Sequence, residues 1–517
     1  MKKSPLSAEI SLRKRYLFKL TTNLFEMAVG MGTQSIVPRA LGPAAYGDFS
    51  FLTSFFWRVI GFLNFNSSSA FYTKLSQRQN EVGLVGFYLY VLIAIGFVIA
   101  LITGIFYSTG INRFVLPGQA GLFVVFGAFW AFLMFCAMVL GEMTDAYGLT
   151  VKAEMLKMGM KIVGLALVII MFWRQWFSLR NFFLYHFFIL IVTIWLLTRT
   201  IFNSSITFDG FWRLRKAQTS AYLLEFSGFC LPLVVFSTFS VLEGILDRWF
   251  IQKFSGSVEQ GFYGLAYQIG AICFLFASAM VPLVAREYAI SYITRDVREM
   301  GRVFSRSAPM LYSIVAYFGC FLAVESKNVM LMFGGQAYSG AILPIAIMCF
   351  FPIHQTYGQL NGSIFFATNR TTVYSNIGIA LFFVGLPLTF FLLGPKSYGA
   401  LQSGATGLAI KMVVLQIASV NIQLWYNTQM MKLPFAKFFV HQVVIILVFV
   451  CAAFMSSYMV SSILGHVHFM LQFIISGLIY TTAIFGVAVS FPSTFSLRQE
   501  EISKILGIFR GKSDLKP

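Results

Sequence analysis

The sequence predicts an all-α integral membrane protein with about fourteen transmembrane helices. Of its 517 residues, 58% are hydrophobic and only 11% are charged, and the mean hydropathy is +0.77. A soluble globular protein is about a quarter charged, so this composition excludes that class. The 59 phenylalanines also indicate a membrane protein, because a protein core alone could not bury so much aromatic surface, whereas lipid can surround it.

Apolar runs of about 18 residues or more, the length that spans the hydrocarbon layer as a helix, recur along the chain. They predict spans at 18–38, 47–71, 83–107, 119–141, 155–173, 181–202, 220–245, 262–285, 306–326, 338–366, 372–393, 403–427, 438–462 and 468–491. None of the segments between them is long enough for an independent soluble domain. An enzyme with a polar catalytic headpiece is therefore disfavoured.

Positive charge is distributed unevenly over the segments between spans. With both termini in the cytoplasm, cytoplasmic segments hold 28 Lys and Arg, and the opposite face holds eight. This bias follows the positive-inside rule and favours an even number of spans. The net charge of +19 is explained in the same way, because the basic residues lie in loops that face anionic lipid headgroups. Nucleic acid is therefore not an expected partner.

The sequence lacks the motifs expected of disulfide-linked proteins, metal sites, cleaved signal peptides and ATP-hydrolysing enzymes. The six cysteines stand singly in apolar segments, with no CxxC pair or nearby histidine, so neither a disulfide framework nor a metal site is expected. The basic stretch 1–19 runs straight into a long apolar segment without a small-residue cleavage site, so the first span is expected to remain as an anchor. No phosphate-binding loop motif occurs, so ATP hydrolysis and cofactors are not expected.

A short internal repeat follows the first and the seventh predicted spans. In each copy a basic residue precedes a glycine by three positions, in the pairs Arg39/Gly42 and Lys253/Gly256. A Tyr-Gly pair then opens the next helix in both copies, at 46–47 and at 263–264. Six spans separate the copies, which predicts two halves of the same orientation with the substrate path between them.

The stretch from Val37 to Gly47 carries a resemblance to a known family. Its pattern resembles the hallmark of Wzx-like polysaccharide flippases. The pattern consists of a basic residue, any residue, Leu-Gly-Pro, two more residues and Tyr-Gly. These form the polysaccharide-transport branch of the MOP superfamily, which also holds the MATE multidrug exporters and the lipid II flippases. The basic N-terminus and the number of spans are similar too, so the likeness covers nearly the whole chain.

The resemblance implies a fold of two six-helix bundles in a V-shaped arrangement, followed by two additional helices. The expected divisions are an N-terminal lobe at 1–202, a linker at 203–219, a C-terminal lobe at 220–430, two more helices at 431–491 and a cytoplasmic tail at 492–517.

The function that the resemblance implies is that of a flippase, not an enzyme. It would move an undecaprenyl-diphosphate-linked oligosaccharide from the cytoplasmic to the outer leaflet of a bacterial inner membrane by alternating access. The other expected partners are membrane lipids and a polysaccharide polymerase, and the chain is expected to act as a monomer. Energy would come from a proton or sodium gradient, the membrane potential or consumption of the cargo.

Charged and polar residues inside spans are the candidates for the site, because charge at membrane depth is costly unless it meets a cavity or a partner. Arg58 and Lys411 lie on the second and twelfth spans and are predicted to bind the diphosphate; the Arg guanidinium can do so with paired donors. Two simpler interpretations remain, an ion pair between Arg58 and Glu26 and snorkelling of Lys411 to the interface. Arg39 of the hallmark joins the cavity candidates.

The remaining candidates are polar side chains on the first, seventh and tenth spans. Glu26 and Gln34 belong to a polar stripe that should face protein or water, and Glu26 is also a candidate for proton coupling. Glu243 and Asp247 stand four residues apart on one helical face, which suits ion coupling or a plain surface cluster. His354 and Asn361 complete the set of cavity candidates.

Two rival functions are left open. A cation or drug antiporter of the same fold would need acidic and aromatic cavity walls, whereas Arg58 and Lys411 favour an anionic lipid. A lipid II flippase is the second alternative within the fold. A membrane-bound polymerase or glycosyltransferase is disfavoured by the lack of a large extracytoplasmic loop.

Overall fold

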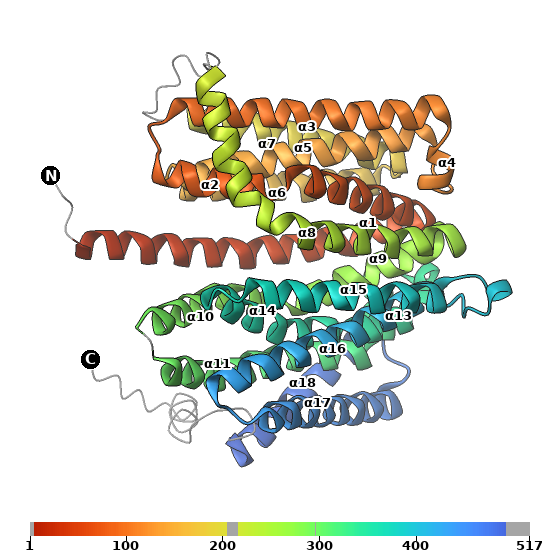
Figure 1. Cartoon of the computed structure of the whole chain (residues 1–517). Coiled ribbons are helices and arrows are strands. Elements are labelled where there is room, and N and C mark those ends of the chain that lie inside the picture. Colours follow the sequence, from red (N-terminus) through yellow and green to blue (C-terminus); the bar gives the residue numbers. More distant parts are fainter. Residues whose placement is uncertain (1–4, 204–215, 295, 493–517) are drawn as a thin grey trace. The chain divides into compact units, whose positions relative to one another are not determined.

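The computed structural model describes residues 5–203, 216–294 and 296–492. Almost all of these residues are helical, and no strand occurs among them (Figure 1). The predicted all-α fold class is confirmed. The expected linker at 203–219 and the tail at 492–517 fall mostly outside the described residues.

The chain divides into two compact units. The first comprises Met1–Gly261 and Leu393–Gly404, and the second comprises Phe262–Leu392 and Ala405–Pro517. The predicted boundary between the N-terminal and C-terminal lobes, the linker at 203–219, was placed from the family resemblance and stays a prediction.

The first unit is built from helices that pack side by side in Figure 1. Their bounds are α1 (Pro5–Asn64), α2 (Ser67–Gln77), α3 (Val82–Thr109), α4 (Asn112–Val115), α5 (Gly121–Ala146), α6 (Thr150–Trp173), α7 (Leu179–Phe202) and α8 (Lys216–Phe254), with the 3₁₀ turn η2 (Lys396–Tyr398) and the start of α9 (Gly256–Cys273). α1 contacts α5, α6 and α8, and therefore forms the middle of this unit. Its core is strongly aromatic, with Phe51, Phe56 and Phe183 fully buried.

The second unit has a comparable all-helical construction. Its elements are the rest of α9, α10 (Leu275–Ile293), α11 (Val297–Val324), α12 (Ser326–Phe333), η1 (Gln336–Ala341), α13 (Ile342–Met348), α14 (Phe351–Ala367), α15 (Thr371–Leu393), α16 (Gly404–Met431), α17 (Phe435–Leu464) and α18 (Phe469–Ser490). α11 is central, because it contacts α10, α13, α14 and α17 and buries about half of its length.

Ten helical segments in the described part of the chain are long and apolar enough to cross a membrane. They coincide one to one with ten of the fourteen predicted spans, from the third to the sixth and from the ninth to the fourteenth. The other four predicted spans lie on α1–α2, α8 and α9–α10, which are helical. α1 carries two of them in succession, because its backbone breaks at Gly42, where φ is 75° and ψ is 166°.

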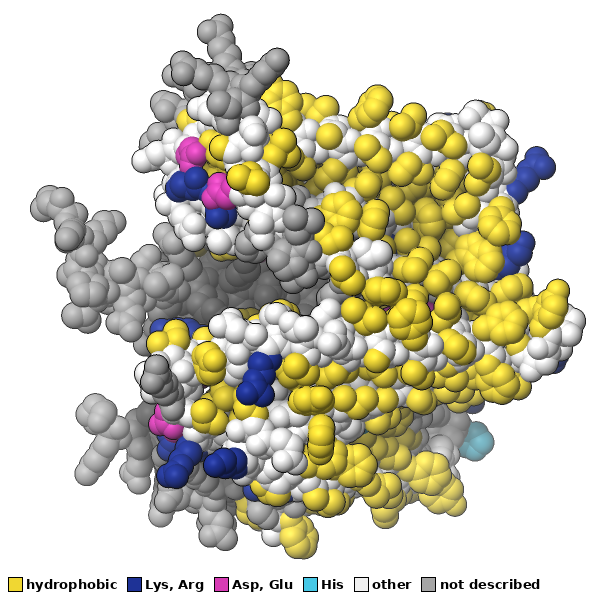
Figure 2. All heavy atoms as spheres, viewed as in Figure 1, with side chains coloured by type: hydrophobic (Ala, Val, Ile, Leu, Met, Phe, Trp, Pro, Cys, Tyr) yellow, Lys and Arg dark blue, Asp and Glu magenta, His cyan; other side chains and the backbone are white. Residues whose placement is uncertain are grey.

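The outer surfaces of both units are apolar. Phe97 of α3, Trp195 of α7 and Leu447 of α17 expose more than half of their surface, and many other large hydrophobic side chains do so as well. Figure 2 shows hydrophobic side chains over much of the visible face of each unit. Exposed apolar surface on this scale is what a lipid environment requires.

The positions of Lys396 and Lys432 beyond the two ends of α16 allow a test of the topology. Both side chains are exposed, and we expect them on opposite sides of the membrane because α16 crosses it once. A cysteine at each position, labelled in intact cells with an impermeant maleimide after the exposed Cys451 has been replaced, should react from outside only at position 396. Labelling of both positions from the same side would overturn the fourteen-span topology.

Candidate functional site

The hallmark segment forms a close junction between α1 and α9. Gly42 and Gly256 both have positive φ, 75° and 83°, a conformation that glycine adopts without steric cost. Gly47 stands five residues after Gly42, as Gly261 does after Gly256. The internal repeat is therefore real, but pairing the Tyr-Gly dipeptides was wrong: Gly261, and not Gly264, is the equivalent of Gly47.

The two equivalent glycines make reciprocal contacts at this junction. A Cβ atom on Gly47 would collide with the carbonyl oxygen of Ser257, and one on Gly261 would collide with the carbonyl oxygen of Pro43. Ser257 and Pro43 are themselves equivalent, since each directly follows its positive-φ glycine. The contact is thus symmetric, and it lets the backbones of α1 and α9 touch directly.

A half-buried carboxylate reinforces the junction. Asp48 Oδ1 accepts hydrogen bonds from Ser257 Oγ at 2.5 Å and from Gln119 Nε2 at 2.6 Å. Gln252 Nε2 donates to Ser257 Oγ at 3.0 Å and to the carbonyl oxygen of Pro117 at 3.1 Å. These bonds connect α1, α8, α9 and the segment before α5.

Of the predicted cavity residues, Arg39 belongs to the hallmark and Gln34 lies just before it. Tyr46 donates its hydroxyl hydrogen to Oε1 of Gln34 at 3.3 Å, so Gln34 is part of the α1 structure around the break. Arg39 is exposed at the same bend. A binding role for either residue stays a prediction.

Arg58 on α1 lies against α8. Its guanidinium occupies the space where a side chain on Gly244 would stand. Gly244 directly follows Glu243 and precedes Asp247 by three residues, so Arg58 meets the stretch of α8 that carries both predicted coupling carboxylates. Asp247 is only 6% exposed and Glu243 is half-buried. The side chain of Glu26, the predicted partner of Arg58, lies outside the described residues.

The candidates of the second unit are buried. Lys411 on α16 is 1% exposed. His354 on α14 packs its ring 5.8 Å from that of Tyr312 on α11. Asn361 accepts a hydrogen bond from Asn427 Nδ2 at 3.1 Å, which ties α14 to α16. The surroundings of His354 and Asn361 are thus those of helix packing.

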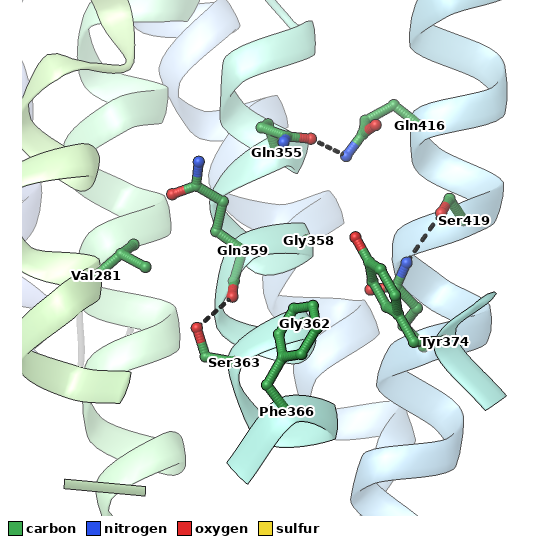
Figure 3. A pocket seen from close by; sticks show the side chains of 11 residues that line it. Val281, Gln355, Gly358, Gln359, Gly362, Ser363, Phe366, Tyr374, Gln416 and Ser419 are labelled. Atoms are coloured by element: carbon green, nitrogen blue, oxygen red, sulfur yellow. Dashed lines mark hydrogen bonds between the residues drawn. The ribbon is translucent and has the colours of Figure 1, made fainter. Parts of the chain in front are cut away.

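The second unit contains a cavity of about 500 Å³ between α10, α14, α15 and α16 (Figure 3). Uncharged side chains form its whole lining, which comprises Val281, Gln355, Gly358, Gln359, Gly362, Ser363, Phe366, Tyr374, Gln416, Ser419 and Gln423. This volume lies in the range of sites at which proteins bind small ligands.

The polar groups of the lining hydrogen-bond partly to one another. Gln416 Nε2 donates to Gln355 Oε1 at 2.5 Å across the space between α16 and α14, and Figure 3 shows this pair at one end of the cavity. Ser363 Oγ donates to the carbonyl oxygen of Gln359 at 2.8 Å, and Gln423 Nε2 donates to Ser419 Oγ at 3.0 Å. Oε1 of Gln423 is buried and has no hydrogen-bond partner among the described residues.

The sequence reasoning missed this cavity although a signal was present. Gln355, Gln359 and Ser363 recur every four residues within one predicted span, and three polar residues of the facing span line the same space. A search for ionisable groups at membrane depth passes over such a stripe, because amides and hydroxyls carry no charge. It selected His354 and Asn361 on the neighbouring face of the same helix, and neither lines the cavity.

Sequence comparison finds no relative: no family model matches the chain, and no curated protein does. Solved structures do match. An inward-facing multidrug resistance MATE family transporter of the MOP superfamily is 15% identical with a TM-score of 0.61, over 80% of this chain and 94% of that one. The lipid II flippase MurJ, in an inward closed conformation, is 12% identical with a TM-score of 0.63, over 92% of this chain and 99% of that one.

A third match is a MOP superfamily transporter from Pyrococcus furiosus, described as having a binding pocket of reverse polarity. It is 15% identical with a TM-score of 0.54, over 81% of this chain and 96% of that one. At such low identity these likenesses establish the fold alone. The chain is a multi-pass membrane protein with the fold of the MOP-superfamily transporters, which include MATE transporters and a lipid II flippase.

Proposed function

We propose that the protein is a flippase for an undecaprenyl-diphosphate-linked oligosaccharide, which it moves by alternating access to the outer leaflet of a bacterial inner membrane. The observation that carries the proposal is the pair of cations within spans. Arg58 packs on the backbone of α8, and Lys411 is almost fully buried on α16. Basic side chains are rare at that depth and mark binding sites and transport paths, and a diphosphate is an anion that both of them are suited to bind during transport.

The extent of the structural likeness supports a lipid-linked cargo. The match to the lipid II flippase covers 92% of this chain, whereas the match to the inward-facing MATE transporter covers 80%. The polysaccharide branch is supported by the hallmark from Arg39 to Gly47, whose Gly42 and Gly47 both have structural roles in the junction of α1 and α9.

The rival function is export of organic cations. A cation exporter needs carboxylates in its cavity wall, and the lining of the cavity in the second unit has none. Glu243 and Asp247 lie on α8 of the first unit, where we propose a role in proton or sodium coupling. Because the cavity lining carries neither acidic nor basic side chains, the preference for the lipid flippase over the cation exporter rests on Arg58 and Lys411.

Deletion of the gene in its own cell tests the proposal. We expect loss of one surface polysaccharide and accumulation of its lipid-linked repeat unit in the cytoplasmic leaflet, both reversed by a plasmid copy. Unchanged surface glycan together with increased sensitivity to cationic drugs would favour the cation exporter instead.

A further inference from the structure

We infer that the cavity of the second unit binds the sugar of the cargo, and that this sugar is an uncharged pyranose rich in hydroxyl groups. The inference rests on the proposed function and extends it, since it assigns the glycan to a site separate from the candidate cations. Neither Arg58 nor Lys411 lines the cavity.

The chemistry of the lining matches a carbohydrate. Four glutamine amides and three hydroxyl groups, those of Ser363, Ser419 and Tyr374, line the space. Each amide offers two donors and an acceptor, and each hydroxyl both donates and accepts, as sugar hydroxyls do. A diphosphate would require Lys or Arg and an organic cation would require Asp or Glu, and the lining contains none of these.

The arrangement of the helices keeps the space open. Gly358 and Gly362 lie on the same face of α14 as Gln355, Gln359 and Ser363. A Cβ on Gly358 would come within 3.0 Å of Gln416 Nε2 and 3.3 Å of Val420 Cγ2, so any larger residue there would press the amide of Gln416 out of place. With glycine at 358 and 362, neither position places a side chain between the cavity and the glutamine amides of α14 and α16.

Aromatic rings stand at the other end of the cavity. Phe366 of α14 and Tyr374 of α15 have ring centroids 5.5 Å apart, and Figure 3 shows them away from the Gln355–Gln416 pair. Phe366 is 55% exposed although it lines the cavity. A pyranose has an apolar face of C–H groups as well as hydroxyls, and a site with rings at one end and amides at the other provides for both.

Gln423 presents a buried acceptor at the wall of the cavity. Gln423 is 6% exposed, and its Oε1 lacks a partner among the described residues while its Nε2 bonds to Ser419. Buried polar atoms are nearly always paired, by protein, water or ligand. A sugar hydroxyl can donate to this oxygen.

The test compares binding of a lipid with and without its sugar. Purified protein in nanodiscs is titrated with bare polyprenyl diphosphate and with the same lipid carrying neutral hexose or N-acetylhexosamine disaccharides. We expect at least one neutral disaccharide to increase the affinity about tenfold, since a few hydrogen bonds suffice for that factor. Gln416→Leu should remove most of this gain and leave binding of the bare lipid unchanged.

Gln429→Leu is the matched control, because Gln429 lies on the same helix, is exposed and does not line the cavity. Gly358→Val provides a second variant that fills the space without removing an amide, and it should also lose the gain. The inference is overturned if no neutral disaccharide improves binding, if Gln416→Leu and Gly358→Val keep the gain, or if a disaccharide with a uronic acid binds better than every neutral one.

The flippase proposal can fail while the sugar-site inference holds, and a further measurement distinguishes the two. If neither lipid binds, the flippase proposal is contradicted, and the cavity is tested with free neutral disaccharides at millimolar concentration. Protection of wild-type protein but not of Gln416→Leu against thermal unfolding would support the sugar site on its own. Equal or absent protection of both would overturn it.

Discussion

Gly47→Ala is expected to lower the melting temperature of the detergent-solubilised protein by roughly 1–3 °C, the consequence of about 1–3 kcal/mol of overpacking in a chain of this length. The added Cβ would collide with the carbonyl oxygen of Ser257, a backbone atom that cannot rotate away. Relief would require α1 and α9 to separate, which would strain the hydrogen bond between Asp48 and Ser257 as well. Gly261→Ala should behave in the same way, since its Cβ would meet the carbonyl oxygen of Pro43.

Gly61→Ala is the control for this prediction. Gly61 lies on α1 as well, but a Cβ there has no atom within 4 Å. Alanine favours a helix over glycine by about 0.5–1 kcal/mol, so this variant should be as stable as the wild type or slightly more stable. Equal melting temperatures of Gly47→Ala and Gly61→Ala would show that the close contact of α1 with α9 contributes little to stability.

The fold was largely predictable because its signals are local. An apolar run of the right length specifies a spanning helix without any knowledge of its neighbours, and ten predicted spans coincide with the ten apolar helices. The break within α1 was predictable too, since 39–47 separates two apolar runs and contains Gly42 and Pro43. The contacts of Gly47 and Gly261 depend on how two distant segments pack. The sequence repeat alone did not reveal them and led to Gly264, instead of Gly261, being paired with Gly47.

The candidate site was only partly predictable, for a similar reason. Arg58 could be singled out because a charge within a span is rare, but its neighbour Gly244 carries no chemical signal of its own. The cavity was missed because its walls come from four helices, and each helix contributes only neutral residues. Charge can be recognised one residue at a time, whereas an uncharged binding site becomes visible only once the helices are assembled.

Under the proposed flippase function, Arg58→Ala should abolish most of the transport of the lipid-linked oligosaccharide, and Arg58→Lys should reduce it partly. A guanidinium binds a diphosphate with paired, fixed donors, while an ammonium acts as a compact point charge, so the lysine variant keeps the charge and loses the geometry. Lys411→Ala should give a smaller loss. The measurement is the amount of surface polysaccharide made by a deletion strain that carries each variant, at matched membrane levels.

The packing of Arg58 on α8 provides a second way to test its role without removing it. Alanine at Gly244 would take the space that the guanidinium occupies and would force it to a new position. Because the end of a long side chain can move at little cost, Gly244→Ala should fold well and still lose transport. Gly228→Ala is the control, since Gly228 lies on the same helix and a Cβ there meets nothing within 4 Å.

The double variant Arg58→Ala, Lys411→Ala decides the cationic mechanism. The two residues belong to different units, and the mechanism requires each of them to bind the diphosphate during the transport cycle. If both act on the same anion, the double variant should retain no transport, and binding of bare polyprenyl diphosphate in nanodiscs should fall by a factor of ten or more for each lost charge–phosphate contact. Wild-type levels of surface glycan from a well-expressed double variant would rule out this mechanism, and Arg58 would then be a structural residue that holds α1 to α8.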